Sequence, residues 1–373
     1  MVLIYIDQAD QEVKKASLEA ISYGAALAKQ MGTHAEALIL GTVKDELASL
    51  GKYGVTKIHQ VANESLNQLD ARVNATVIAE AVKLAGADVI VFAHNTNGKA
   101  IAPAVAVKLN AGIVTGASAL PKTDNGFVVT KTVFSGKAFA SIKIETAIKV
   151  ITINQNSFGV QTAEGTATIE TLSVSVPASS IKITSVNKVQ GEIPLTEATL
   201  VVSGGRGLKG PENWGVLLDL AKALGASTAC SRPVSDSDWR PHHEHVGQTG
   251  YQIAPNLYIA IGISGAIQHL AGVNRSKTIV VINKDPEAPF FKAADYGVVG
   301  DAFEVVPALT AAITASVNCS QPRLAWLSGN PSSTVKTAFN SKTPCSAQRT
   351  KLPFSGLLIP KSAAIDVAIL PPP

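Results

Sequence analysis

Short apolar runs alternate with amphipathic segments along the first part of the chain. The apolar runs have the length and composition of buried strands, and the amphipathic segments repeat their apolar positions at helical spacing. The strand-like runs are 2–6, 34–40, 57–61 and 88–92. The helix-like segments are 12–31, 46–51, 74–85 and 100–109. This alternation predicts a parallel β-sheet whose strands are joined by right-handed helical crossovers.

The period changes in the stretch that follows. Apolar runs at 127–134, 138–144 and 147–153 succeed one another with only Gly136 and polar turns between them. Because short spacing of this kind is typical of antiparallel strands, we expect these runs to be added to one side of the sheet. Residues 168–186 predict one or two further strands.

A polar connector at 187–196 leads into a second series of strands and helices. The strand-like runs are 198–203, 257–261, 278–285 and 294–301, and residues 213–224 have the helical pattern. Each run ends in Gly, Ser, Asn or Asp, so short polar groups and backbone donors gather at the carboxyl edge of the predicted sheet. In a doubly wound sheet, that edge binds nucleotide-like ligands.

These patterns predict an α/β fold with two domains. Residues 1–190 form an N-terminal α/β domain with added antiparallel strands, and residues 197–313 form a doubly wound, Rossmann-like domain with a parallel sheet. Residues 314–373 hold eight of the nineteen prolines and lack a sustained period. We therefore expect the last segment to be an unstructured tail.

Composition narrows the class of protein. Hydrophobic residues make up 46% of the chain and aromatic residues only 5%, which favours an aliphatic core of parallel strands. The net charge of +4 comes from the tail, where six Lys and Arg residues face one Asp. The remaining 26 basic and 27 acidic residues nearly cancel. A near-neutral body argues against a nucleic-acid partner.

Cysteine usage and apolar run lengths bear on the compartment. Cys230, Cys319 and Cys345 have no paired spacing, so they indicate neither a disulfide framework nor a zinc site. Met1 leads directly into a strand, and no apolar run reaches the roughly 18 residues of a membrane span. We expect a cytoplasmic protein that is not an integral membrane protein.

Two loops of the second domain are candidate ligand contacts. Gly204, Gly205 and Gly207 follow a strand, but their spacing does not match the dinucleotide fingerprint of NAD enzymes. Ser264 and Gly265 lie where a helix is predicted to begin, and the N–H groups of a helix start attract anions. An ordinary helix capped by Ser264 is the alternative. The polar pair Gln268-His269, early in an otherwise apolar helix, favours a ligand.

Six motifs of the second domain occur in an order that resembles the alpha subunit of electron transfer flavoprotein. They are Ser203-Gly-Gly-Arg-Gly207, Ser231-Arg-Pro233, Val246-Gly-Gln-Thr-Gly250, the run from Leu257 to Gly272, Ile282-Asn-Lys-Asp-Pro-Glu-Ala-Pro289 and Ala294-Asp-Tyr-Gly-Val-Val-Gly-Asp301. The resemblance extends over about residues 1–313, and residues 200–307 are its specific part.

The resemblance implies that FAD binds to the second domain. Ser264, Gly265 and Ala266 would direct their N–H groups at the pyrophosphate, and Arg206 would add a counter-charge. Asn283 and Asp301 would bind the adenosine part, where a carboxylate suits ribose hydroxyls. The family pattern implies further FAD contacts at Val246, Gly247, Gly262, Ile267, Gln268 and Ala302.

The resemblance also assigns residues to the flavin ring. Ser231 and Arg232 would lie against the isoalloxazine, Thr249 and Gln248 near its N5 atom, and His269 beside the pyrimidine carbonyl. In this reading Arg232 and His269 stabilise an anionic semiquinone, so that single electrons can pass. No catalytic residue and no metal ligand is implied.

The function that the resemblance implies is that of an electron carrier rather than an enzyme. The chain would pair with a beta subunit that carries AMP, and would pass electrons from acyl-CoA or other flavin dehydrogenases of fatty acid β-oxidation to a quinone-linked oxidoreductase. A subunit of an NADH-dependent electron-bifurcating complex, with a second FAD in the beta subunit, is the alternative. A nucleotide-binding sensor without redox work is a third hypothesis.

Three features leave alternatives open. His242, His243 and His245 fit a solvated loop, a loop that tunes the flavin potential with pH, or, less well, a metal site. The loop 95–98 fits either a nucleotide-binding loop or a capped turn between a strand and a helix. Cys230 fits a buried strand residue better than a reactive thiol.

Overall fold

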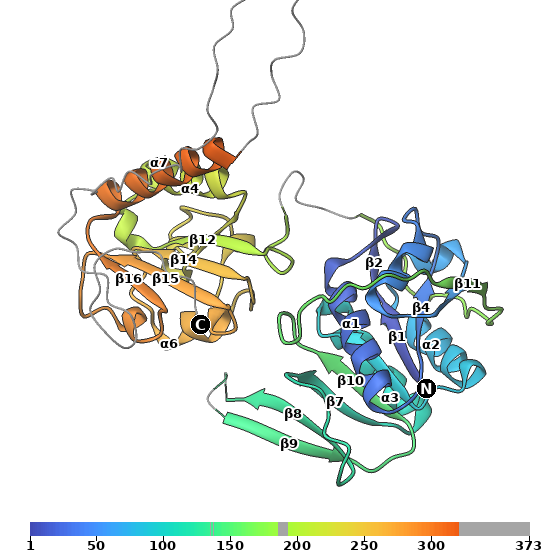
Figure 1. Cartoon of the computed structure of the whole chain (residues 1–373). Helices are drawn as coiled ribbons and strands as arrows, with labels where there is room; N and C mark the ends of the chain where they lie inside the picture. Colours follow the sequence, from blue (N-terminus) through green and yellow to red (C-terminus); the bar gives the residue numbers. More distant parts are fainter. Residues whose placement is uncertain (135, 137, 186–192, 321–373) are drawn as a thin grey trace, which may run out of the picture. The chain divides into compact units, whose positions relative to one another are not determined.

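A computed structural model describes residues 1–134, 136, 138–185 and 193–320. The chain divides into two compact units that are not contiguous in sequence. The first unit contains residues 1–199, 246–256 and 268–277, and the second contains 200–245, 257–267 and the residues from 278 onward. Each unit is built on its own sheet (Figure 1).

Among the described residues, the first unit contains a nine-stranded sheet with the order β11-β5-β4-β1-β6-β10-β7-β8-β9. Its pairs are parallel except β7 with β8 and β8 with β9. The strands are β1 (Val2–Ile6), β4 (Ala35–Leu40), β5 (Lys57–Val61), β6 (Val89–Ala93), β7 (Gly112–Ala117), β8 (Phe127–Val133), β9 (Ala138–Ile144), β10 (Lys149–Ile153) and β11 (Thr168–Thr171).

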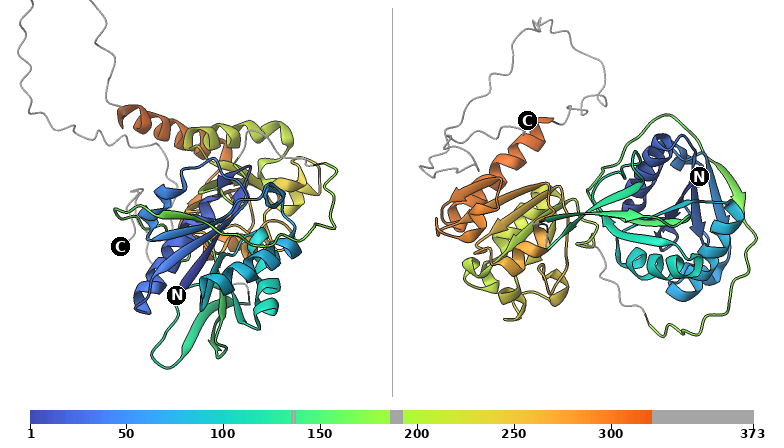
Figure 2. Two further views of the ribbon diagram at one scale, coloured as in Figure 1. Left: turned by 90° about the vertical axis from the view of Figure 1, so that its right-hand side faces the viewer. Right: turned by 90° about the horizontal axis from the view of Figure 1, so that it is seen from below.

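Helices cover both faces of this sheet (Figure 2). Helix α1 (Lys15–Gln30) buries Tyr23 and Leu27 in the cluster on one face. Helices α2 (Ala71–Ala85) and α3 (Thr96–Leu109) pack against each other and fill the cluster on the opposite face. The short 3-10 helices are η1 (Leu47–Tyr53) and η2 (Glu64–Asn67). The predicted parallel core of the first domain is thereby confirmed.

Two sequence predictions in this unit need correction. The helix expected at 12–31 begins only at Lys15, because β3 (Glu12–Val13) pairs with β2 (Gln8–Ala9) as a hairpin. The run at 147–153 is not antiparallel: β10 lies between β6 and β7 and is parallel to both. Residues Val150 to Ile153 are buried, and a strand covered on both faces belongs inside a sheet.

Within residues 193–320, the second unit contains a five-stranded sheet that is entirely parallel, with the order β13-β12-β14-β15-β16. The strands are β12 (Leu200–Gly204), β13 (Ser227–Cys230), β14 (Leu257–Ile261), β15 (Thr278–Asn283) and β16 (Tyr296–Val299). This order matches the second common type of doubly wound sheet, in which the first strand lies between the second and the third. The predicted parallel sheet is confirmed.

Helices α4 (Gly215–Leu224) and α7 (Ala302–Ser320) lie side by side on this sheet (Figure 1). Leu217, Leu220 and Val306 are completely buried in the core they share with the strands. The short helices are α5 (Arg232–Ser235), α6 (Ile267–Val273), η3 (Arg206–Leu208), η4 (Pro211–Trp214), η5 (His242–Glu244) and η6 (Pro289–Lys292).

Helix α7 changes the predicted start of the tail. It continues to Ser320, so the expectation that residues 314–320 are unstructured is wrong. The apolar spacing of Val306, Leu309 and Ile313 on the sheet extends the helix into this region. The rest of the predicted tail, 321–373, lies outside the described residues.

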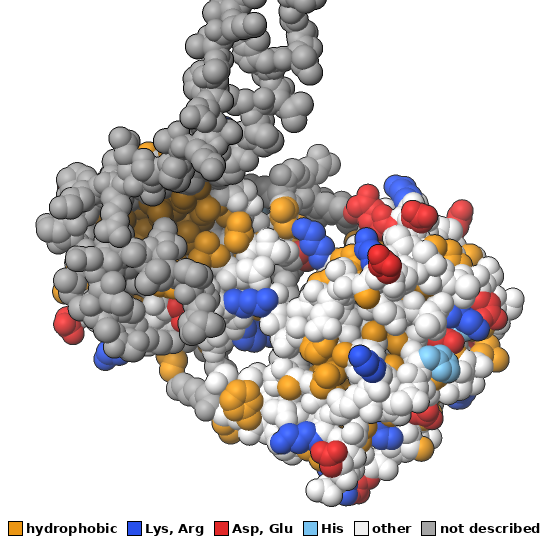
Figure 3. Space-filling view, in the orientation of Figure 1, with side chains coloured by type: hydrophobic (Ala, Val, Ile, Leu, Met, Phe, Trp, Pro, Cys, Tyr) orange, Lys and Arg blue, Asp and Glu red, His pale blue; other side chains and the backbone are white. Residues whose placement is uncertain are grey.

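The helices and the surface bear on whether the chain could contact a membrane. No helix among the described residues combines the length and the apolar character that crossing a membrane requires. On the face of the first unit shown in Figure 3, acidic and basic side chains are interspersed with apolar ones.

Candidate functional site

The candidate site lies at the carboxyl edge of the second sheet, between β12 and β14. The chain leaves β12 toward β13 on one side and returns to form β14 on the other side. The loops after these two strands therefore diverge, and such a switch point is where doubly wound sheets bind ligands. The carboxyl edge predicted from the sequence is thus present in the structure.

The two diverging loops touch through their backbones. The N–H of Gly205 donates to the carbonyl of Ile261 at 2.9 Å, and that of Gly207 donates to the carbonyl of Gly262 at 3.0 Å. A Cβ atom on Gly207 would lie 2.6 Å from the Cα of Gly262, and Gly262 itself has a φ of +62°. Glycines permit this close approach. Arg206, which is exposed, lies between Gly205 and Gly207, the two residues that make these contacts.

The loop from Ser264 to Ala266 forms a cradle. Gly265 has a φ of +82°, and a Cβ there would overlap Phe290, whose N–H donates to the carbonyl of Ser264 at 3.0 Å. Within residues 193–320, the N–H groups of Ser264, Gly265 and Ala266 donate no hydrogen bond to the protein. Unpaired backbone donors beside exposed side chains suit a phosphate group.

The helix after this cradle begins later than the sequence indicated. Helix α6 starts at Ile267, three residues beyond Ser264. Ser264 is therefore not its N-cap residue, and the alternative of an ordinary helix capped by Ser264 is wrong. The donors of the cradle belong to the loop and not to the helix.

Asn283 and Asp301 stand at the ends of the next two strands. The Asn283 side chain donates to the carbonyl of Ile263 at 3.0 Å, which ties β15 to the cradle loop. One Asp301 oxygen accepts the N–H of Phe303 at 3.0 Å, and Lys284 lies 4.0 Å from the other oxygen. Ala302 begins α7 and is buried.

Ser231 and Arg232 follow β13 at the same edge. Ser231 is buried, and its N–H donates to the carbonyl of Gly204 at 3.0 Å. The Arg232 guanidinium is 61% exposed and bonds the Asp236 carboxylate at 3.2 Å. Sequence reasoning overlooked Asp236, although the i,i+4 spacing on a helical turn is a signal for such a pair.

The remaining predicted residues belong to the first unit. They are Val246, Gly247, Gln248, Thr249, Gln268 and His269. Two segments meet here, since the N–H of Gln248 donates to the carbonyl of Gln268 at 2.7 Å. His269 is buried and Thr249 is exposed. Within the first unit, the structure thus brings the segment of Gln248 and the segment of Gln268 together.

The histidine loop is anchored by hydrogen bonds. The His242 Nδ1 atom lies 2.7 Å from the Ser235 hydroxyl, and the buried Glu244 forms an ion pair with Arg240. His245 is buried beside β13, where burial and the charge of Arg232 lower its pKa. The alternative of a solvated histidine loop therefore does not hold for His245, which is buried. Among the described residues, no group of three or more His, Cys, Asp or Glu side chains is arranged to hold a metal ion.

Cys230 is a buried strand residue, as the sequence favoured. Burial, followed by the charge of Glu244, raises the pKa of its thiol to about 12. The thiol is therefore protonated at neutral pH, and a reactive thiolate is excluded.

The loop after β6 is a capped turn. The Asn95 side chain accepts the N–H of Gly98 at 2.8 Å and donates to Asp7 at 2.7 Å. These contacts support the capped turn of the two readings that the sequence left open.

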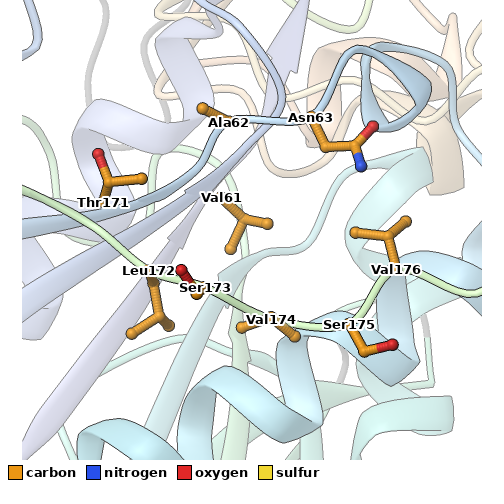
Figure 4. Close-up of a pocket in the computed structure, with 9 residues that line it drawn as sticks. All are labelled: Val61, Ala62, Asn63, Thr171, Leu172, Ser173, Val174, Ser175 and Val176. Carbon is orange, nitrogen blue, oxygen red and sulfur yellow. The ribbon is translucent and has the colours of Figure 1, made fainter.

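A separate pocket of about 460 Å³ lies in the first unit, beside the end of β5 (Figure 4). It is lined by Val61, Ala62, Asn63 and residues 171–176. The side chains that line it include no titratable group, so they supply no general acid or base.

Comparison with known proteins shows the family to which the chain is similar. Residues 2–177 match the family model of the electron transfer flavoprotein domain, and residues 194–274 match that of the electron transfer flavoprotein FAD-binding domain.

Curated relatives extend over nearly the same stretch. The chain is 37% identical over 314 residues to the electron transfer flavoprotein subunit alpha of Bacillus subtilis, which covers 83% of this chain and 96% of that protein. It is 36% identical over 310 residues to the same subunit of Syntrophomonas wolfei, at 82% and 96%. It is 41% identical over 244 residues to the protein FixB of Escherichia coli O127:H6, at 64% and 78%.

Proposed function

Because the chain belongs to the electron transfer flavoprotein alpha-subunit family, we propose that it carries electrons through an FAD held at the carboxyl edge of its second sheet. The observation that carries this proposal is the cradle of Ser264, Gly265 and Ala266 at the switch point of the sheet. Its N–H groups donate no hydrogen bond to the described residues. The pyrophosphate of FAD supplies the acceptors that these donors lack.

Each residue of the edge has a task in this proposal. The cradle N–H groups hold the pyrophosphate, and Arg206 adds a positive charge from the neighbouring loop. One carboxylate oxygen of Asp301 accepts the N–H of Phe303 at the start of α7. The other oxygen takes no part in this bond and can accept hydrogen bonds from ribose hydroxyls. FAD supplies the one-electron chemistry when it is bound.

Following the family resemblance, we propose that Ser231, Arg232, Thr249, Gln248 and His269 contact the ring of the cofactor. The guanidinium of Arg232 beside the ring would favour added negative charge there. Arg232 follows β13 at the edge of the sheet. The family resemblance implies that the flavin ring lies beside this residue. Asp236 partly neutralises the guanidinium and so limits its effect.

The partners follow from the family. We propose a heterodimer with a beta subunit that carries AMP, a cytoplasmic location, donors among acyl-CoA or other flavin dehydrogenases, and a quinone-linked acceptor. The second candidate is a subunit of an NADH-dependent bifurcating complex. The relative from Syntrophomonas wolfei bears the same subunit name as that from Bacillus subtilis, so the names of relatives favour neither candidate.

The test is a count of cofactors. The full chain is produced together with its beta subunit, and FAD and AMP are released and quantified per heterodimer. One FAD and one AMP support the simple carrier, and two FAD support the bifurcating complex. A colourless heterodimer that does not take up added FAD would overturn the proposed function.

A further inference from the structure

Four basic side chains gather in the first unit, near the carboxyl ends of β6, β10 and β7. These strands are neighbours in the sheet, in the order β6, β10, β7 (Figure 1). His94 directly follows β6, and Lys99 lies in the first turns of α3. Lys131 comes from β8, and Arg275 comes from the segment after α6. His94 and Lys99 are close in sequence, but Lys131 and Arg275 are distant from them, so only the tertiary structure gathers all four.

The end of β10 provides the floor of this basic cluster. Thr152 is fully buried, and its hydroxyl lies 2.6 Å from the His94 Nδ1 atom. Asn154 is also buried, and its side-chain oxygen accepts a hydrogen bond from Arg275 at 3.1 Å. The Lys131 ammonium donates to the Thr115 hydroxyl of β7 at 3.3 Å.

Hydrogen bonds to the backbone fix this floor in place. The hydroxyl of Thr152 accepts the N–H of Gly116 at 2.9 Å. The side-chain amide of Asn154 donates to the carbonyl of Gly116 at 2.9 Å. Both polar side chains are therefore positioned by β7 before any ligand binds, which lowers the entropic cost of binding.

No carboxylate balances the cluster within the described residues. Lys99, Lys131 and Arg275 form no ion pair with any described residue. Asp7, which lies near the same loop, is already bound by Asn95, Asn97 and Lys14. The guanidinium of Arg275 uses one of its five donors, on Asn154.

Burial and mutual repulsion both lower pKa values in this cluster. Burial, followed by the charges of Lys99, Arg275 and Lys131, lowers the pKa of His94 to about 4. Partial burial and then the charge of Arg275 lower the pKa of Lys99. Like charges gathered on a buried polar floor are costly unless an anion neutralises them.

We propose that His94, Lys99, Lys131 and Arg275 form a binding site for a phosphate group in the first unit. The positive charges of Lys99, Lys131 and Arg275 attract the phosphate anion, and the planar fork of Arg275 can donate two parallel hydrogen bonds to its oxygens. None of the four side chains is among the residues assigned to FAD, and all four belong to the first unit, whereas the cradle belongs to the second.

A phosphate fits this cluster better than a monovalent anion. Its several oxygens can accept from the Arg275 fork, both ammonium groups and the His94 ring at once. A chloride ion presents one charge and no directional acceptors, so it would leave most of these donors without a partner.

The test measures the binding of inorganic phosphate to the purified full-length protein saturated with FAD, by isothermal titration calorimetry in a chloride buffer. Arg275→Gln and Lys99→Gln should each weaken phosphate binding about tenfold or more, since each removes a charge-assisted hydrogen bond. The matched controls Lys277→Gln and Lys108→Gln remove exposed charges from the same segments and should leave the affinity within about twofold.

A variant of the second unit separates this site from the FAD edge. Arg206→Gln should leave phosphate affinity unchanged. If Arg206→Gln abolishes binding while Arg275→Gln does not, the phosphate occupies the FAD edge and the proposal is overturned. Absence of phosphate binding at millimolar concentration, or equal affinity in all variants, overturns it as well.

A second readout does not depend on the variants folding. Phosphate should raise the pKa of His94, because an anion favours the imidazolium form. The ring proton signals of His94, followed by NMR against pH with and without phosphate, should show this rise. An unchanged His94 titration would contradict the proposed site.

Discussion

The balance of charge around Arg232 is the decisive feature at the scale of single residues. Its guanidinium is exposed and forms an ion pair with Asp236 at 3.2 Å, so part of its field is cancelled before any cofactor is considered. Exposed pairs contribute little to folding, which means that either partner can be replaced without loss of the fold. The pair is therefore a means of adjusting a potential at low structural cost.

Substitutions of the two partners should shift the potential of bound FAD in opposite directions. Arg232→Ala should lower the first reduction potential, and Asp236→Asn should raise it, each by an amount on the order of tens of millivolts, since about 1.4 kcal/mol corresponds to 59 mV. Potentiometric titration of the heterodimer measures both. Arg232→Lys is the matched control that keeps the charge, and shifts of equal sign in the two variants would contradict the assignment.

His94 makes a prediction about the pH dependence of stability. Its pKa in the folded chain is about 4, below the ordinary 6.5. As the pH falls from 6.5 toward 4, the unfolded chain binds a proton that the folded chain does not, so the folded state loses stability. This contribution is fully present above pH 6.5.

The variant His94→Asn should remove that part of the pH dependence while retaining a polar partner for Thr152. Urea unfolding at several pH values, in a buffer free of phosphate and sulfate, measures the difference between the two proteins. The stability of the wild-type protein should approach or fall below that of the variant as the pH decreases. A constant difference from pH 7 to pH 4 would show that His94 does not titrate as expected.

At the scale of elements, the two loops after β12 and β14 carry the site. Their close approach depends on Gly205, Gly207 and Gly262, and the cradle depends on Gly265. The glycine pattern in the sequence indicated a ligand loop, but the spacing alone did not reveal that the loops contact each other. That contact arises because β12 and β14 are neighbours in the sheet.

Gly265→Val should abolish flavin binding without unfolding the second unit. Its φ of +82° is strained for a branched residue, and the added side chain would collide with Phe290, displacing the cradle. Gly215→Ala is the control, because a Cβ at Gly215 meets no atom within 4 Å. The ratio of flavin absorbance to protein absorbance after purification measures the loss. Full flavin content in Gly265→Val would contradict the role of the cradle.

At the scale of the whole molecule, the chain forms two units, and each is built from segments that are not contiguous in sequence. Residues 246–256 and 268–277 belong to the first unit although they lie between strands of the second. The predicted boundaries at 190 and 197 describe the chain as two consecutive blocks. The structural units therefore do not coincide with the two consecutive blocks.

Removal of residues 321–373 should leave the flavin content unchanged. The strands, the cradle and helix α7 all lie within the residues up to Ser320. The core of the second unit is formed by residues such as Leu217, Ile259 and Val306, all before that position. A stop codon after Ser320, followed by measurement of FAD per heterodimer and of the melting temperature, provides the test. Loss of flavin on truncation would assign those residues a part in binding.

The elements that could be predicted are those whose signal lies in neighbouring residues of the sequence. The runs at 2–6 and 57–61 became β1 and β5 with unchanged bounds, because apolar strands between helices carry their own pattern. The position of β10 in the sheet could not be predicted. The short connection before β10 has the length of a hairpin turn, and that length does not show whether the strand pairs with its predecessor or returns to the centre of the sheet. β7 was overlooked because Gly112–Ala117 lacks a continuous apolar run.

The sequence by itself determined the succession of strands and helices, the glycine loops and the resemblance to one family, because these depend on neighbours along the chain. Only the tertiary structure decided which loops meet, that Ser264 precedes the helix instead of capping it, and that Arg232 has Asp236 as a partner. It also gathered His94, Lys99, Lys131 and Arg275 around the end of β10. Contacts between distant residues follow from the order of strands in a sheet, and no local pattern encodes that order.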